Sequence, residues 1–325
     1  MQRQIKAAFI LLLAVAALLS SLAYLTNAFH SLGSSDPLLF GFASFLFISS
    51  ILAWLFSWAL LLKSESLGLG RILLLGFSCV FAALTPIQIG AEALRSIKLK
   101  EAGLVSYRQS ISASMVVKGL KFLMIFLVAS AAFFASLLNP ELELWLKAAM
   151  LSGFAVVAIA AMLFLLPLKH SVGLKIAGLF KSMSRFFRPF GKLSEYFIHY
   201  SGFLRGLSLE KLAAVTMLAF LSLLLEFLAF LFCFHSANTV IPLYSAVTLF
   251  SILVILERTP FLPRGILAVE AVGFIFLSLK SFTSVELSPA SIAAVIIIFD
   301  VIRLVIPTIL SLLAYSLFFS KKGRP

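Results

Sequence analysis

The hydrophobic positions of this chain of 325 residues lie in long runs separated by short polar segments. A helix that crosses a bilayer needs about 20 mainly apolar residues, because each residue adds about 1.5 Å to its length. Six runs reach that length, and we predict a membrane-spanning helix for each. They are residues 5–26, 38–62, 110–138, 144–168, 212–234 and 291–319. The pattern therefore predicts an all-α polytopic membrane protein with six full spans.

Two other apolar segments are interrupted by proline and glycine. Each reads Thr-Pro, then Gly, then Glu. These residues are Thr85, Pro86, Gly90 and Glu92 in the first segment and Thr259, Pro260, Gly265 and Glu270 in the second. The run before the first break, residues 72–84, has 13 residues and is too short to cross. Broken backbone at membrane depth is tolerated only where protein or a water-filled cavity covers it. We therefore predict two re-entrant helical hairpins, at residues 71–97 and 243–280.

The basic residues are distributed unevenly between the connecting segments. Residues 27–37 contain no Lys or Arg, residues 139–143 are acidic, and residues 169–211 contain eight Lys or Arg against two Glu. Because Lys and Arg concentrate on the cytoplasmic side, both termini are predicted to be cytoplasmic. The first hairpin then enters from the inside and the second from the outside. Residues 1–138 and 139–325 are thus predicted to be inverted repeats of one membrane domain, an architecture common in secondary transporters.

Composition agrees with a membrane protein of the cell membrane. Hydrophobic residues make up 62% of the chain and charged residues 12%, and the mean hydropathy is +1.12. Soluble domains carry about 25% charged residues. The net charge of +13 lies in loops beside the spans, so anionic headgroups explain it better than nucleic acid does. The two cysteines are far apart, with no metal-ligand spacing, so we expect no metal and no cofactor.

The basic segment at residues 169–211 allows two interpretations. Its aromatic residues alternate with basic ones: Phe180, Phe186, Phe187 and Phe190 among Lys181, Arg185 and Arg188. This pattern is typical of an amphipathic helix that lies on an anionic leaflet. An ordinary basic loop accounts for it equally well.

Ionisable residues within spans are unfavourable in a bilayer and are functional candidates by default. Glu92 and Arg95 are three residues apart after the first break, and Asp300 and Arg303 are three apart in the last span. Broken helices also expose backbone N–H groups that favour phosphate. We predict a polar cavity for an anionic headgroup, and expect Glu226 to be a packing residue. The predicted substrate-binding residues are Thr85, Pro86, Gly90, Glu92, Arg95, Lys118, Lys121, Thr259, Pro260, Arg264, Gly265, Glu270, Asp300 and Arg303.

These features favour a lipid transporter over an enzyme. The sequence contains no Ser/His/Asp set, Cys/His pair or Asp-rich metal motif. One alternative is an intramembrane lipid-phosphate transferase that uses Glu92 or Asp300 as a base. The other is a non-catalytic accessory subunit of a lipid-linked glycosyltransferase or lipid-modifying enzyme, docked through residues 169–211.

The broken segments also resemble a known family. Residues 84–95, with Pro86, Gly90, Glu92 and Arg95, are similar to the Pro…Gly-Glu-x-x-Arg segment of the lysylphosphatidylglycerol synthase transmembrane family, also described as flippase-like domain proteins. Residues 264–271 resemble its Pro-Gly-Gly-x-Gly-x-x-Glu-Ala segment, and residues 302–307 resemble its Arg-containing last helix. The resemblance covers nearly the whole chain. It implies movement of a polar-headed lipid between leaflets, either alone or beside a separate lipid-modifying enzyme.

The chain departs from the family pattern in two places. Lys118-Gly119 and Phe122 stand about where the family often has Glu-Arg and a later Asp. The glycine run of the second motif is reduced to Gly265. The resemblance therefore implies the class of substrate but not the particular headgroup.

Overall fold

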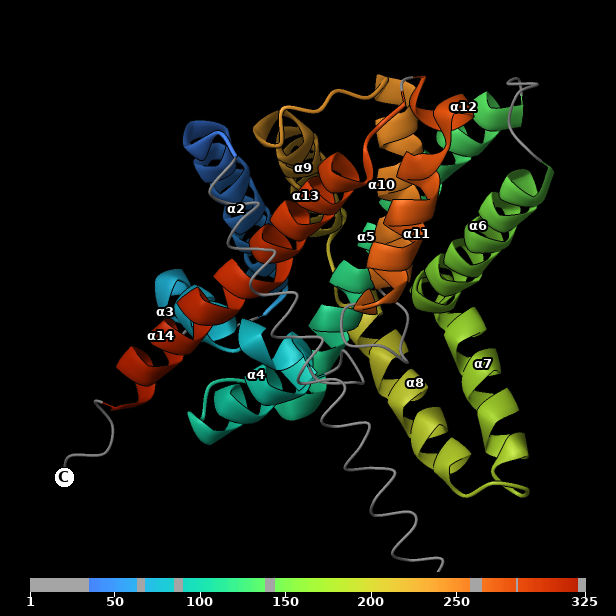
Figure 1. Ribbon diagram of the computed structural model, residues 1–325. Coiled ribbons are helices and arrows are strands. Elements are labelled where there is room, and N and C mark those ends of the chain that lie inside the picture. Colours follow the sequence, from blue (N-terminus) through green and yellow to red (C-terminus); the bar gives the residue numbers. More distant parts are fainter. Residues whose placement is uncertain are drawn as a thin grey trace, which may run out of the picture.

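The computed structural model describes residues 35–62, 68–84, 90–137, 144–257, 265–284 and 286–320. Within these ranges every regular element is a helix (Figure 1), so the predicted all-α class is confirmed. The predicted span at residues 5–26 and the Thr-Pro pairs of both broken segments lie outside the described residues.

Four helical stretches of the described part are long and apolar enough to cross a bilayer. They are α2 (Pro37–Leu61), α5 (Tyr107–Leu137), α9 (Leu209–Ser236), and the pair α13 (Pro289–Asp300) and α14 (Ile306–Ser320). Each coincides with a predicted span. The helix α6 (Leu144–Leu165) occupies most of a fifth predicted span and is followed by the 3₁₀ turn η2 (Leu166–Leu168). The chain is thus a multi-pass membrane protein.

The last predicted span is interrupted near its middle. A π-helical turn, η4 (Val301–Val305), joins α13 to α14 and contains Arg303. Single π turns inside α-helices occur frequently at functional sites. The sequence predicts a continuous α-helix here. A π turn changes the register of the backbone hydrogen bonds but has no distinctive residue pattern by which it could be recognised.

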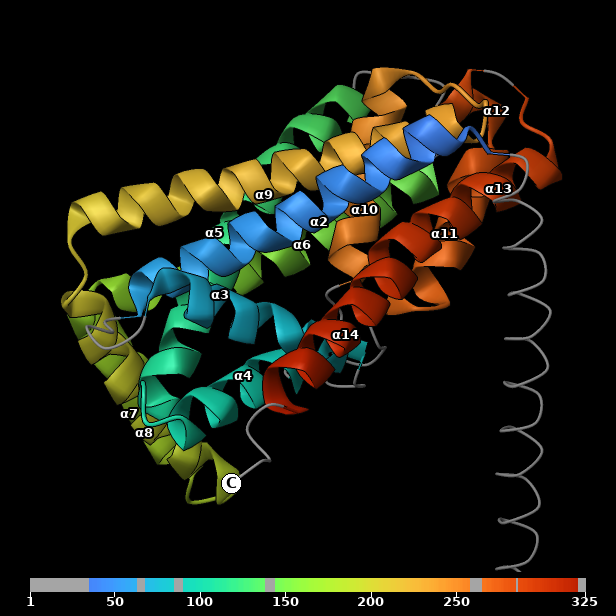
Figure 2. The same ribbon diagram turned by 90° about the vertical axis from the view of Figure 1, so that its left-hand side faces the viewer.

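The helices α2 and α9 pack along each other, and Figure 2 shows them side by side in front of α5, α6 and α10. Asp36 caps α2 by accepting hydrogen bonds from the backbone N–H groups of Leu38 and Leu39, and Pro37 occupies the first helical turn. The backbone N–H of Asp36 also donates to the carbonyl of Ser236 over 2.9 Å. Since the start of α2 meets the end of α9, the two helices are antiparallel.

The first broken segment consists of α3 (Leu69–Ser78), the 3₁₀ turn η1 (Val80–Leu84) and α4 (Gly90–Glu101). The indole Nε1 of Trp58, near the end of α2, donates to the carbonyl of Ser110 over 3.4 Å. Ser96 on α4 donates to the hydroxyl of Ser110 over 2.8 Å. Since α3 follows α2 and α5 follows α4, this segment starts and ends at the same end of the bundle (Figure 2).

The second broken segment consists of α10 (Leu243–Glu257), α11 (Ala268–Ser278) and α12 (Lys280–Thr283). The hydroxyl of Ser245 at the start of α10 donates to the carbonyl of Phe282 in α12. The helices α10 and α11 pack against each other (Figure 1). This segment therefore starts and ends at the opposite end of the bundle, where α2 begins and α9 ends.

Glycine is required at the second break for a steric reason. Gly265 has a φ of +69°, and a Cβ at this position would lie 2.7 Å from the carbonyl oxygen of Leu256. Leu267, two residues later, also has a positive φ of 75°. The chain thus reverses tightly against the end of α10 before α11 begins, which a residue with a side chain at position 265 would obstruct.

The basic segment forms two helices, α7 (His170–Met183) and α8 (Pro189–Arg205), packed as an antiparallel hairpin. It lies at the end of the bundle where α2 ends and α9 begins (Figures 1 and 2). The segment is therefore not an irregular loop. The alternating Phe and basic residues do not lie on one helix, because they extend from the end of α7 through the connection to the start of α8.

Candidate functional site

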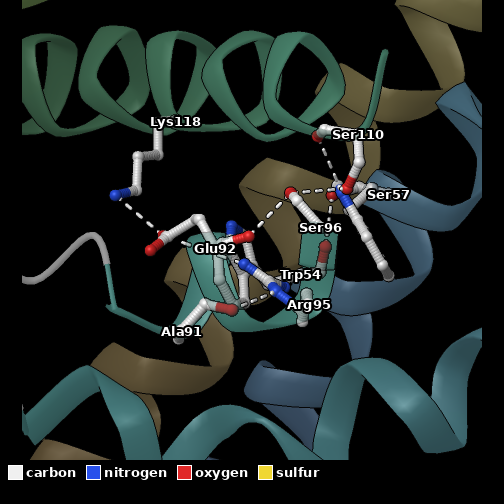
Figure 3. A network of polar contacts seen from close by, with 9 residues as sticks. Trp54, Ser57, Ala91, Glu92, Arg95, Ser96, Ser110 and Lys118 are labelled. Atoms are coloured by element: carbon white, nitrogen blue, oxygen red, sulfur yellow. Dashed lines mark hydrogen bonds and ion pairs between the residues drawn. The ribbon is translucent and has the colours of Figure 1, made fainter. Parts of the chain in front are cut away.

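The first cluster of buried charges is built on α4 and α5, as Figure 3 shows. Because α4 begins at Gly90, Glu92 lies in its first turn and Arg95 one turn later. Oε1 of Glu92 lies 2.7 Å from Nζ of Lys118 on α5 and 3.8 Å from Nη2 of Arg95. Glu92 is only 3% exposed. One buried carboxylate is thus shared between two cations.

Arg95 is held by aromatic rings more than by hydrogen bonds. Its guanidinium carbon lies 4.5 Å from the ring centroid of Trp54 and 4.8 Å from that of Trp58, both on α2. Its Nε donates to the carbonyl of Ala91 over 3.3 Å, and neither Nη atom has a hydrogen-bond partner among the described residues. Since Arg95 is 1% exposed, its charge is compensated by the carboxylate of Glu92 together with the faces of the two indoles.

A second charged pair links α5 to α9. Nζ of Lys121 lies 2.5 Å from Oε1 of Glu226 and donates to the hydroxyl of Ser222 over 3.2 Å. All three side chains are buried. We expected Glu226 to be a packing residue, yet it is the carboxylate that compensates Lys121. The sequence signal for this pair is weak: a buried lysine needs a counterion, and Ser222 and Glu226 share one face of α9 at i, i+4 spacing.

The third cluster lies on α11, α13 and η4. Nε of Arg303 donates to Oδ1 of Asp300 over 2.6 Å, and Nη2 donates to Oε1 of Glu270 over 2.8 Å. The guanidinium carbon also lies 5.4 Å from the ring centroid of Phe299. Arg303 is fully buried. Here one guanidinium is shared between two carboxylates, the reverse of the arrangement around Glu92.

A cavity of about 80 Å³ lies between the two broken segments and the helices α2, α5 and α9. It is lined by Phe47, Ile51, Trp54, Val80, Ala83, Ala91, Glu92, Lys118, Lys121, Glu226 and Glu257. Residues on both sides of the first break therefore share a wall with Glu257, the last residue of α10. The volume holds a few water molecules and is well below the roughly 300–1,000 Å³ of a small-molecule pocket.

The structure brings some of the predicted site residues together and leaves others apart. Glu92, Lys118 and Lys121 line the cavity, and Arg95 is paired with one of them. Glu270, Asp300 and Arg303 contact one another but are not among the cavity-lining residues. Gly90 and Gly265 lie where α4 starts and just before α11. Thr85, Pro86, Thr259, Pro260 and Arg264 lie outside the described residues.

Sequence reasoning missed two contributors to this site. Glu226 and the Trp54–Trp58 pair were not among the predicted substrate-binding residues. Glu226 and Trp54 line the cavity, and the rings of Trp54 and Trp58 contact Arg95. Trp54 and Trp58 occur at i, i+4 spacing on α2, which places them on one helix face. That spacing alone is also typical of ordinary packing, so it does not single out a guanidinium partner.

Comparison with known proteins supports the resemblance read from the motifs. No curated protein and no solved structure shows significant similarity to the chain. The family described as the lysylphosphatidylglycerol synthase TM region matches residues 5–311, which include the charged clusters and the cavity described above. The chain therefore belongs to the lysylphosphatidylglycerol synthase transmembrane-region family.

Proposed function

We propose that this protein moves a polar-headed lipid between the leaflets of the cell membrane and is not itself an enzyme. The observation that carries the proposal is the small cavity lined by Glu92, Lys118, Lys121, Glu226 and Glu257. Carboxylates and lysines inside an otherwise apolar bundle are unfavourable in a bilayer, and in membrane proteins they mark substrate or ion pathways. Membership of a family named for a lipid-modifying synthase supports a lipid as the substrate.

The packing of the helices supports the inverted-repeat arrangement. The helix α5 packs on α10, the first arm of the second broken segment, and α14 packs on α3, the first arm of the first segment. Likewise α4 packs on α5, and α11 packs on α13. Each of these contacts made by a helix of one half thus has a counterpart made by the corresponding helix of the other half. The helices α2 and α9, which correspond to each other, pack against each other. Such repeats place the substrate site where the broken helices meet.

The ion pairs suggest how the cavity recognises a headgroup. Each of its two lysines is matched by a carboxylate within 2.7 Å, so it does not present bare positive charge. A phosphate that enters would compete with Glu92 for Lys118, and an ammonium group on the same headgroup would compete for the carboxylates. We propose a headgroup that carries both a phosphate and further polar or cationic groups. Because the volume of about 80 Å³ is too small for such a headgroup, the proposal requires the cavity to widen when the lipid enters.

The transferase alternative is less well supported. The two carboxylates considered as general bases, Glu92 and Asp300, each accept a charge-assisted contact, from the partly buried Lys118 and the buried Arg303 respectively. An ion-paired carboxylate is a weak base. The accessory-subunit alternative would require a protein partner for residues 169–211, and the experiment on the α7–α8 hairpin below bears on it.

The test is leaflet exchange of labelled lipids in vesicles that contain the purified protein. We expect Glu92→Gln to slow exchange at least tenfold, because it removes the carboxylate that pairs with Lys118. The matched control is Glu101→Gln on the same helix, an exposed residue that pairs with Lys98 over 2.9 Å, and it is expected to leave exchange unchanged. Phosphatidylglycerol, its lysyl ester and phosphatidylcholine would be compared as substrates. Equal rates for the parent protein and Glu92→Gln, with both folded, would refute the proposal.

A further inference from the structure

The hairpin formed by α7 and α8 ends in an exposed apolar surface that the proposed transport does not use. Residues 179–188, here called the hairpin tip, comprise the end of α7 and the connection to α8. Phe186 in the tip is 92% exposed, Leu179 is 61% exposed and Phe187 is 58% exposed. Large aromatic side chains exposed together at one end of a protein mark an interaction site with a protein or a membrane.

The other aromatic residues of the hairpin are already used in its interior. The ring of Phe180 stacks with those of Phe190 and Phe197, at centroid distances of 5.8 Å and 5.3 Å. The two helices also approach closely at Gly173, where a Cβ would lie 2.6 Å from the hydroxyl of Ser201. These contacts hold the helices together without Phe186. Its outward position therefore has no structural role within the described residues.

The charges around the tip point to an anionic occupant. Lys181, Arg185 and Arg188 are exposed beside the aromatic residues, and residues 179–188 include no Asp or Glu. Guanidinium groups next to phenyl rings suit the boundary between headgroups and acyl chains. There the rings leave water while the guanidinium groups bind phosphate.

The placement of the hairpin favours a membrane surface over a protein partner. Its base is fixed to the bundle, because the hydroxyl of Tyr200 donates to the carbonyl of Phe164 over 2.8 Å and Arg108 lies 2.6 Å from Nε2 of His199. From this base α7 and α8 run crosswise to α2 and α9, as Figure 2 shows. A helix pair that leaves the end of the spans crosswise to them follows the plane of the leaflet rather than extending into water.

We propose that the hairpin tip inserts into the headgroup region of the adjacent leaflet and binds anionic lipids there. Phe186 and Phe187 enter the boundary with the acyl chains, and Arg185, Arg188 and Lys181 bind lipid phosphates. The tip would thereby fix the hairpin to the bilayer at a distance from the cavity. This proposal does not depend on the transport proposal, because neither its residues nor its test involves the movement of lipid.

The test is the immersion depth of a spin label attached to Phe186→Cys in the full chain, reconstituted into vesicles. The two native cysteines are buried, and Cys79→Ser and Cys233→Ser would make the label unique, with serine able to keep the hydrogen bond from position 233 to Ala229. Depth is read from collisions with oxygen, which concentrates in the bilayer, and with a water-soluble nickel complex. The matched control is Glu195→Cys, an exposed acidic position on α8.

In vesicles that contain phosphatidylglycerol we expect the label at position 186 to collide more with oxygen, and the label at 195 more with nickel. Adding Arg185→Gln and Arg188→Gln should return the label at 186 to water, which the nickel collisions would show. A label at 186 that prefers nickel in phosphatidylglycerol vesicles would overturn insertion. Equal depth in pure phosphatidylcholine would overturn the anionic selectivity. Protection from both reagents would assign the tip to a protein contact and would also overturn the proposal.

Discussion

The two buried arginines, Arg95 and Arg303, are compensated in opposite ways. Around Arg95 the described residues comprise two cations and one carboxylate, Glu92, and the guanidinium lies against two indole rings. At Arg303 two carboxylates, Asp300 and Glu270, are bonded directly to the guanidinium, and a third, Glu257, is near enough to interact with it electrostatically. The two halves therefore place their arginines in different elements, Arg95 on α4 of the first broken segment and Arg303 in the last span, and surround them with different chemistry.

This difference separates a cluster that faces the cavity from one that stabilises the bundle. Glu92 and Lys118 line the cavity, and a ligand that draws Lys118 away would leave Glu92 next to Arg95. The cluster around Arg303 is bonded at 2.6–2.8 Å and does not line the cavity. Arg303 also lies on a π turn, at the point where Glu270 of α11 contacts the last span. The looser cluster is the better candidate for exchanging partners with a substrate.

The largest effect is expected from Arg303→Met. Removing this guanidinium leaves the buried Asp300 and the partly buried Glu270 without their partner, and breaking a buried ion pair from one side destabilises by about 3–5 kcal/mol. Arg95→Met should destabilise less, because Lys118 stays 2.7 Å from Glu92. Unfolding of the purified proteins in detergent would measure both. If Arg95→Met proved equally or more destabilising, the contrast between the two clusters would be wrong.

An intermediate effect is expected from Trp54→Leu, which removes one of the rings against Arg95. A buried cation–π contact contributes about 2 kcal/mol, and the loss of ring volume adds to the destabilisation. Trp54→Phe keeps an aromatic face and should lose only part of that stability. Comparing the melting temperatures of Trp54→Leu and Trp54→Phe separates the loss of the cation–π contact from the loss of ring volume. Equal losses for both would show that Trp54 acts by filling space and not by holding the guanidinium.

The smallest effect is expected from Glu101→Gln. Its carboxylate pairs with Lys98 over 2.9 Å on the same helix as Glu92 and Arg95, but the pair is exposed to solvent. Exposed pairs at i, i+3 contribute less than about 1 kcal/mol. The melting temperature should stay close to that of the parent protein. A large decrease would mean that burial does not distinguish this pair from the pair formed by Glu92.

Much of the fold could be predicted, because span length is a local property of the sequence. The helices α2, α5, α9 and α13–α14 coincide with runs counted from hydropathy alone, and the motif around Glu92 and Arg95 led to the correct family. The partner of Lys121 could not be predicted, because Glu226 lies 105 residues away in the sequence and local residue spacing does not indicate contacts over that separation. The π turn at Arg303 and the helix pair in the basic segment were missed for a similar reason.

The sequence by itself determined that the chain is all-α, crosses the membrane several times and has two broken segments with buried charges, because these follow from hydropathy, proline and glycine. Only the tertiary structure decided how the charges are shared. Glu92 is joined to Lys118, Lys121 to Glu226, and Arg303 to two carboxylates at once. The physical reason is that burying a charge requires a partner, but any nearby helix can supply one. Which helix does so depends on how the bundle packs.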